Sequence, residues 1–380
     1  MATDMAGWVL DRVLRERAAT VPDRPFIEVV GDRAETFGET FAAASRLAAR
    51  LEELGVEKGD AVVIMATNVF EAVHGWIAAN MLGAIDVGIN TAYRGQLLEH
   101  ALNVVQARII LVDEQFLPVL RESEGRLPHL EKAVHFRAFG TSYDDGPPPR
   151  FERLALLPLW GEGERRLADA TGRAAFNDIA SVIYTSGTTG PAKGVMMPHA
   201  QTHQLAQQMI YALRMEADDV LYCFHPLFHM AAKFMAVYAA MLAGCKVVLD
   251  ARFEAEHWLD RIRQYGATVS LAHGPMIEMI FDQPARPDDA ENPMRRFMAG
   301  GFPKRIAAEF ERRFDLKGIE VWGMTETNCP CWRPFDEPLR LGSCGKIVAD
   351  WVDFQIVDPE TDEELPAGES GEFVVRPKEP

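Results

Sequence analysis

The residues best suited to chemistry form one short run, Tyr184-Thr185-Ser186-Gly187-Thr188-Thr189-Gly190-Pro191-Ala192-Lys193-Gly194. It follows the apolar stretch 181–183 and combines glycines, hydroxyl side chains and one lysine. Glycines let the backbone approach a ligand closely and present N–H groups to an anion, while Lys193 adds a positive charge. The order of residues does not fit the Walker A pattern. We therefore predict a phosphate-binding loop after a buried strand, rather than an ordinary surface turn.

This run resembles the signature phosphate loop of the adenylate-forming superfamily, which includes acyl-CoA synthetases, peptide-synthetase adenylation domains and luciferases. The resemblance implies that the loop holds the β- and γ-phosphates of ATP. The residues to which it assigns this role are Thr185, Ser186, Gly187, Thr188, Thr189, Gly190 and Lys193.

A second segment, Val321-Trp322-Gly323-Met324-Thr325-Glu326, resembles the nucleotide motif of the same superfamily. There an aromatic ring lies near adenine, the threonine contacts the α-phosphate and the glutamate helps to hold Mg²⁺. A carboxylate is a ligand that a hard cation prefers. The family usually has tyrosine where this chain has Trp322, whose larger ring can still stack but lacks the phenol oxygen. The resemblance implies catalytic roles for Thr185, Lys193, Thr325 and Glu326, with Mg²⁺ near Glu326 and Thr185.

Two weaker motifs complete the predicted site. The segment Ala299-Gly300-Gly301-Phe302-Pro303 resembles the glycine pair against which adenine and the acyl group lie, and Pro226-Leu227-Phe228-His229 resembles the wall of the carboxylate pocket. The resulting nucleotide contacts outside the phosphate loop are Gly300, Gly301, Phe302, Trp322, Gly323, Met324 and Thr325. The substrate pocket is predicted to contain His229, Lys233, Gly300, Trp322 and Gly323.

Lys233 interrupts an otherwise apolar helix predicted from Met230 to Leu242. Its ammonium group either faces a polar or second acidic group of the substrate, or reaches solvent along an apolar stem. The sequence leaves both alternatives open.

Short apolar stretches alternate with stretches of helical spacing, such as Phe41 to Leu54. Five of the short stretches have the composition of buried parallel strands: 61–65, 109–112, 181–184, 246–249 and 268–271. This alternation predicts an α/β fold of two doubly wound lobes. The segments Trp351 to Val357 and Gly371 to Arg376 predict a small antiparallel, barrel-like subdomain. The expected ranges are 1–200 for the first lobe with its phosphate loop, 201–330 for the second lobe and 331–380 for the start of the barrel-like piece. Together they correspond to the large N-terminal domain of adenylate-forming enzymes.

Composition narrows the class of protein. The net charge of −17 argues against a nucleic-acid partner. Five irregularly spaced cysteines do not make a disulfide scaffold, and Cys329-Pro330-Cys331 lacks the spacing of structural zinc ligands. The N-terminus lacks the features of a signal peptide, and the apolar stretch Phe234 to Cys245 is too short to cross a bilayer. We expect a cytoplasmic protein with no membrane span. The sequence leaves open whether the protein forms a homodimer.

The resemblance implies an ATP-dependent acid–CoA ligase. A carboxylate attacks the α-phosphate of Mg·ATP to give an acyl-adenylate and pyrophosphate, and the thiol of CoA then displaces AMP. The motifs most resemble the crotonobetaine/carnitine-CoA ligase-like branch. Two alternatives remain: an amino-acid-type adenylation domain, which Lys233 disfavours because that helix commonly carries an acidic residue for the substrate amine, and a non-catalytic nucleotide-binding module.

Complete members of the superfamily continue past the position of Arg376 to a ribose-binding aspartate, and then to a small mobile domain with a catalytic lysine. Neither is found before Pro380. We therefore expect the mobile C-terminal domain to be absent and this sequence to be cut from a longer protein.

Overall fold

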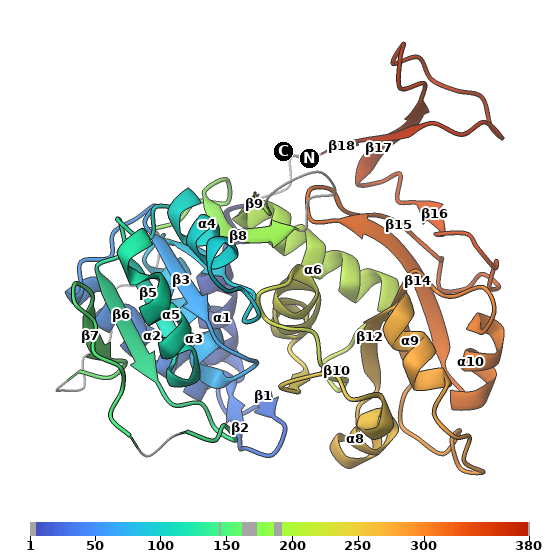
Figure 1. Ribbon diagram of the computed structural model, residues 1–380. Helices are drawn as coiled ribbons and strands as arrows, with labels where there is room; N and C mark the ends of the chain where they lie inside the picture. Colours follow the sequence, from blue (N-terminus) through green and yellow to red (C-terminus); the bar gives the residue numbers. More distant parts are fainter. Residues whose placement is uncertain (1–4, 144–145, 162–172, 186–191, 379–380) are drawn as a thin grey trace. The chain divides into compact units, whose positions relative to one another are not determined.

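The computed structural model describes residues 5–143, 146–161, 173–185 and 192–378 (Figure 1). The chain divides into two compact units, one formed by Met1–Gln207 with Glu216–Phe253 and the other by Gln208–Met215 with Glu254–Pro380. Most of the predicted second lobe before residue 254 therefore groups with the first unit. The three expected residue ranges stay a prediction.

The first unit contains a seven-stranded sheet. Its order, from one edge to the other, is β7 (Ala155–Pro158), β6 (Lys132–Phe136), β5 (Ile109–Asp113), β3 (Ala61–Met65), β4 (Ile85–Gly88), β8 (Ile179–Thr185) and β9 (Lys193–Pro198). Neighbouring strands are parallel except β8 and β9, which are antiparallel. The predicted strands at 61–65, 109–112 and 181–184 are confirmed. Their largely apolar composition reflects burial on both faces of a parallel sheet.

Helices cover both faces of this sheet, as the doubly wound prediction requires. On one face, α4 (Gln96–Val104) and α5 (Leu117–Ser123) contribute to a buried cluster with β3, β4, β5 and β8. On the other face, α3 (Phe70–Met81) comes so close that a Cβ on Gly75 would lie 2.6 Å from Leu111 Cδ1. The neighbouring α2 (Phe37–Glu53) begins at a capping box formed by Thr36 and Glu39, which satisfies two backbone donors.

The remaining strands of the first unit form the order β10 (Val220–Cys223), β11 (Lys246–Leu249), β1 (Pro25–Val29) and β2 (Ala34–Thr36). The first three are parallel, and β2 is antiparallel to β1. Further helices of this unit are α1 (Leu10–Thr20), the π-helical segment η4 (Ala231–Tyr238) and α7 (Ala239–Ala243), and α6 (His199–Leu213) belongs to it up to Gln207. The predicted helix after His229 is thus confirmed as helical, but its first two turns are π-helical.

The second unit contains three parallel strands, β12 (Val269–His273), β13 (Arg296–Gly300) and β14 (Lys317–Met324). Two antiparallel strands, β15 (Asn328–Trp332) and β16 (Lys346–Ile347), extend them. The helices are α8 (Trp258–Tyr265), α9 (Gly274–Phe281) and α10 (Ala307–Phe314). Trp258, Phe297, Phe310 and Phe314 pack ring against ring in the core of this unit.

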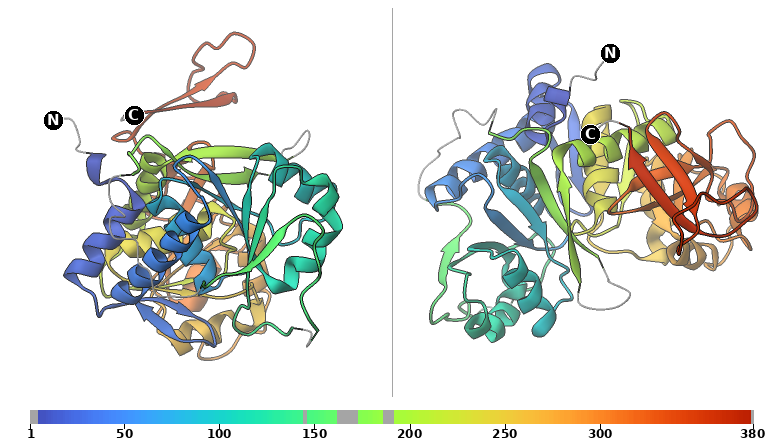
Figure 2. Two further views of the ribbon diagram at one scale, coloured as in Figure 1. Left: turned by 90° about the vertical axis from the view of Figure 1, so that its left-hand side faces the viewer. Right: turned by 90° about the horizontal axis from the view of Figure 1, so that it is seen from above.

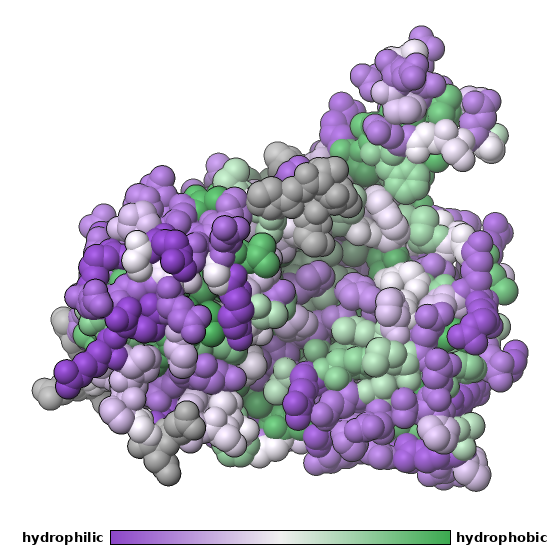
Figure 3. All heavy atoms as spheres, viewed as in Figure 1, coloured by the Kyte–Doolittle hydropathy of each residue, from purple (hydrophilic) through white to green (hydrophobic). Residues whose placement is uncertain are grey.

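The chain after residue 350 forms the antiparallel pair β17 (Val352–Val357) and β18 (Glu372–Pro377), drawn in red in Figure 2. The two strands predicted here from the sequence are confirmed. Phe373 and Val374 are 45% and 47% exposed, and hydrophobic surface is visible on this ribbon in Figure 3. Among the described residues no helix is long and apolar enough to cross a membrane.

Candidate functional site

The ends of the predicted phosphate loop are joined by strand pairing. Thr185 is the last residue of β8, Lys193 is the first of β9, and the two are direct partners in the antiparallel ladder. Thr185 Oγ1 also donates to the carbonyl oxygen of Lys193 over 3.5 Å. Lys193 is exposed and Thr185 half-buried. Two of the predicted phosphate ligands are therefore neighbours at the base of the loop, whereas Ser186, Gly187, Thr188, Thr189 and Gly190 lie outside the described residues.

Helix α4 of the first unit contacts the residues on either side of the loop. The Tyr184 hydroxyl donates to the carbonyl oxygen of Ala101 in α4 over 2.5 Å, and His100 Nε2 lies 3.1 Å from the carbonyl oxygen of Ala192. A Cβ on Gly194 would lie 2.8 Å from Val182 Cγ1 of β8, so a larger residue here would require a local shift. These contacts tie Tyr184 and Ala192, which are described residues on either side of the loop, to helix α4.

A buried asparagine holds the Pro226–His229 segment. Asn68 Nδ2 donates to the carbonyl oxygens of His225 and Asp250 over 2.7 Å each, and Asn68 Oδ1 accepts from the Leu227 N–H over 2.8 Å. His229 is half-buried at the start of the π-helical turn. Its Nδ1 accepts from the Ala231 N–H over 3.2 Å, so the neutral ring carries its proton on Nε2. Asn68 was not predicted from the sequence, because it lies in no local motif.

Lys233 does not reach solvent, so that alternative is wrong. Its side chain is 3% exposed and forms an ion pair with Asp86 of β4, which is fully buried. The same carboxylate oxygen, Asp86 Oδ2, accepts from Ser181 Oγ of β8 over 2.6 Å. Burial lowers the pKa of Lys233, and the charge of Asp86 opposes this effect. Asp86 was not predicted from the sequence; the signal that could have found it is an aspartate among the apolar residues of β4.

In the second unit, the glycine pair closes β13. A Cβ on Gly300 would lie 2.6 Å from His273 Nδ1, and Gly301 has a φ of +76°, which favours glycine. Phe302 is 3% exposed, and its ring packs against Phe310 in the core. The ring of Phe302 is therefore turned into the core, and contact of a nucleotide with Gly300 and Gly301 stays a prediction.

The segment from Trp322 to Glu326 ends β14 and turns toward β15. A Cβ on Gly323 would lie 2.2 Å from the carbonyl oxygen of Asn328, so the backbones meet at this glycine. Thr325 is 6% exposed, whereas Glu326 is exposed and Met324 is 46% exposed. The ring of half-buried Trp322 packs edge-on against Phe373, with centroids 4.9 Å apart.

The parallel register joins these two motifs. Gly300 is paired with Val321, so Gly301 and Trp322 follow at adjacent strand ends. Ligands of open α/β sheets bind at this carboxyl edge. Glu326 supplies an exposed carboxylate of the kind that Mg²⁺ bound to phosphates prefers. The described residues contain no group of three or more metal-ligating side chains, so a metal here would depend on ligand oxygens as well.

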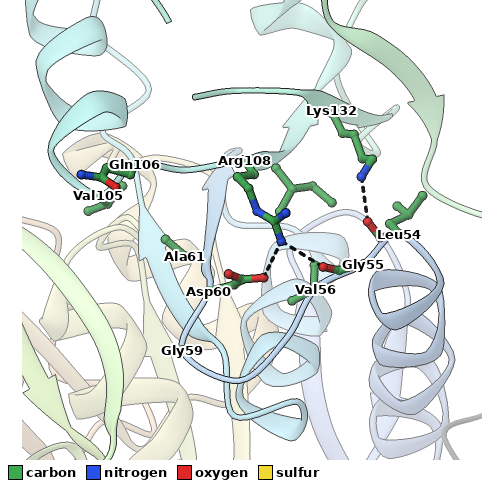
Figure 4. A pocket seen from close by; sticks show the side chains of 11 residues that line it. Leu54, Gly55, Val56, Gly59, Asp60, Ala61, Val105, Gln106, Arg108 and Lys132 are labelled. Atoms are coloured by element: carbon green, nitrogen blue, oxygen red, sulfur yellow. Dashed lines mark hydrogen bonds and ion pairs between the residues drawn. The ribbon is translucent and has the colours of Figure 1, made fainter. Parts of the chain in front are cut away.

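A cavity of about 290 Å³ lies at the opposite, amino edge of the seven-stranded sheet (Figure 4). Arg108 Nη2 donates to the Gly55 carbonyl and to Asp60 Oδ2 over 3.1 and 2.9 Å, and Lys132 Nζ donates to the Leu54 carbonyl over 2.9 Å. Both cations bind carbonyls at the C-terminal end of α2, where positive charge is stabilising. We interpret the cavity as a structural feature, separate from the loop that follows β8.

Comparison with known proteins assigns the chain to a family. Residues 14–378 match the model of the AMP-binding enzymes, and the chain belongs to that family. It is 28% identical over 382 residues to 4-coumarate–CoA ligase 2 of Oryza sativa subsp. japonica, covering 95% of this chain and 65% of the plant enzyme. It is 29% identical over 332 residues to the medium/long-chain-fatty-acid–CoA ligase FadD6 of Mycobacterium tuberculosis, covering 87% and 53% respectively. The chain thus spans between half and two thirds of the length of these relatives.

Solved structures of CoA ligases and related proteins have a fold similar to that of this chain. ATP-bound MatB from Rhodopseudomonas palustris superimposes with a TM-score of 0.81 at 23% identity, covering 97% of this chain and 70% of that one. The likeness confirms the α/β fold predicted from the sequence. The family itself is shown by the match of residues 14–378 to the AMP-binding enzymes.

Proposed function

We propose that this chain is the nucleotide-binding part of an ATP-dependent acid–CoA ligase, which converts a carboxylic acid to an acyl-adenylate and transfers the acyl group to CoA. The observation that carries the proposal is the strand pairing of Thr185 with exposed Lys193 at the ends of a hydroxyl-rich loop. Membership of the AMP-binding enzymes supports it, as do the names of both curated relatives, which are CoA ligases.

The roles proposed for individual residues follow from their chemistry. Lys193 and the loop hydroxyls bind the β- and γ-phosphates, which leave as pyrophosphate. Thr325 donates to the α-phosphate, where charge develops during attack by the carboxylate. Mg²⁺ held by Glu326 and phosphate oxygens would neutralise part of this charge. The bare backbone of Gly300 and Gly301, with the ring of Trp322, binds adenine.

The acid is proposed to lie beside His229. The polar ring of His229 is half-buried and is fixed by a hydrogen bond from the backbone of the π-helical turn. π-Helical turns are frequent at functional sites. Lys233 is already neutralised by Asp86. We therefore propose that the acid carries an uncharged body, rather than a second acidic group paired with Lys233.

The proposal is tested by changing Lys193 to Met and measuring Mg·ATP binding by calorimetry. A charge-assisted hydrogen bond contributes about 1.5–3 kcal/mol, so the dissociation constant should rise roughly 10- to 150-fold. Since Lys193 is exposed, the free energy of unfolding without ligand should change by less than about 0.5 kcal/mol. Lys58→Met, which removes a surface pair with Asp178, is the matched control and should leave ATP affinity unchanged.

Two outcomes would contradict the proposal. Equal ATP affinity in wild type and Lys193→Met would reject the phosphate loop. ATP binding in the natural full-length gene product without acid-dependent ATP–pyrophosphate exchange, across a panel of aromatic and aliphatic acids, would support a non-catalytic nucleotide-binding module instead.

A further inference from the structure

Two cysteine side chains of the second unit lie in contact. Cys331 belongs to β15 and Cys344 precedes β16, and their Sγ atoms are 3.6 Å apart. Both are free thiols. A disulfide has an S–S length of about 2.05 Å, so the sulfurs need to approach by only about 1.5 Å. Neither the proposed ligase chemistry nor the nucleotide motifs use these thiols.

The backbone holds Cys344 in this position. The next residue, Gly345, has a φ of +104°, and a Cβ on it would lie 2.0 Å from the carbonyl carbon of Trp332. Only glycine allows this approach, which brings the chain before β16 directly against β15. Pairing of Cys331 with Ile347 and of Trp332 with Lys346 continues the contact. The thiols therefore meet because two backbones are packed together, not because of one side-chain rotamer.

The two thiols differ in access to solvent. All five cysteines are described; Cys344 is half-buried, whereas Cys223, Cys245, Cys329 and Cys331 are buried. Burial raises the pKa of Cys331, and the neighbouring Cys344 raises it further. Because Cys344 is the more accessible thiol, a reagent in solution should react first at Cys344. Cys331 can then act as the resolving thiol, which displaces the reagent from Cys344.

We propose that Cys331 and Cys344 form a dithiol site that small disulfides of the glutathione class oxidise to an intramolecular disulfide. The thiolate of Cys344 attacks one sulfur of oxidised glutathione, breaks its S–S bond and releases one glutathione thiolate, which takes up a proton. Cys331 then loses its proton and attacks Cys344 Sγ, which forms the protein disulfide and releases a second glutathione. The disulfide would link the two ends of the segment 331–344 into a covalent loop. One end of this loop, Cys331, is the strand partner of Trp322.

The test is incubation of the native protein with millimolar oxidised glutathione, alkylation of remaining thiols and mass spectrometry of tryptic peptides. Cleavage after Lys317, Arg340 and Lys346 separates Cys344 from a peptide that contains both Cys329 and Cys331. We expect these two peptides to be joined, and dithiothreitol to separate them. The variant Cys329→Ser is the control, in which the joined species should form to the same extent.

Single variants distinguish the two steps. Cys331→Ser should accumulate a stable mixed disulfide of glutathione on Cys344, because the resolving thiol is missing. Cys344→Ser should resist glutathione altogether, because the remaining cysteines are buried. A wild type that stays reduced, that keeps glutathione on Cys344, or that joins its peptides only when Cys329 is present would overturn the proposal. Circular dichroism of each variant verifies that it is folded.

Discussion

Replacing Lys233 with Met should destabilise the protein far more than the loss of one surface charge. The change removes the counter-charge of Asp86, whose side chain is fully buried in β4. Asp86 Oδ2 would keep its hydrogen bond from Ser181, but Oδ1 has no hydrogen-bond partner among the described residues. Breaking a buried ion pair by removing one partner costs about 3–5 kcal/mol, because it leaves an uncompensated charge. We expect a loss in this range.

The same structure predicts that a second substitution restores part of the loss. In Lys233→Met with Asp86→Asn, the amide keeps a group of the same shape beside Ser181 and carries no charge. Neutralising both partners of a buried pair is often close to neutral in stability. A double-mutant cycle with the two single variants should therefore give a coupling energy of about 2–3 kcal/mol.

Urea denaturation followed by tryptophan fluorescence measures the four free energies of unfolding. Lys246→Met is the matched control, because the Lys246–Glu28 pair has the same chemistry over 2.7 Å but both side chains are more than 20% exposed. That control should lose less than about 1 kcal/mol. A Lys233→Met variant as stable as Lys246→Met, or a coupling energy near zero, would refute the reasoning.

Three further predictions concern other residues. Asn68→Ala should lose roughly 3 kcal/mol in urea denaturation, because it removes buried hydrogen bonds to the Leu227 N–H and to the carbonyls of His225 and Asp250, whereas half-buried Asn103→Ala, which removes a bond to the Arg126 carbonyl, should lose under about 1 kcal/mol. Burial raises the pKa of Asp11 from 3.8 to about 6, so the folded protein keeps a proton that the unfolded chain has released; this contribution is complete below 3.8 and is lost as pH rises through 6. The free energy of unfolding should therefore fall by up to about 3 kcal/mol across that window relative to Asp11→Asn, and a constant difference would contradict the assignment. Glu326→Gln should raise the Mg²⁺ concentration that half-saturates ATP binding by about tenfold, with exposed Glu360→Gln unchanged, and equal Mg²⁺ dependence would exclude Glu326 as a ligand.

Much of the fold followed from local patterns in the sequence. The strands at 61–65 and 109–112 are continuous β-branched and apolar runs, and such short runs are typical of strands buried on both faces. The prediction of a phosphate loop is equally local, because its glycines, hydroxyls and lysine lie within a few residues of each other. In these cases chain neighbours and spatial neighbours are the same residues.

Tertiary structure decided what each isolated polar residue does. The charge of Lys233 was visible in the sequence, but its partner Asp86 lies 147 positions away, and only the packing of η4 against β4 pairs them. Asn68 likewise meets Leu227 across 159 positions, and Cys331 meets Cys344 because Gly345 lets two backbones touch. The burial of individual side chains is also decided by packing, because the ring of Phe302 is buried only where it packs against the ring of Phe310. Sequence spacing determines which face of an element a side chain occupies, but the partner across that face is fixed only when the elements pack.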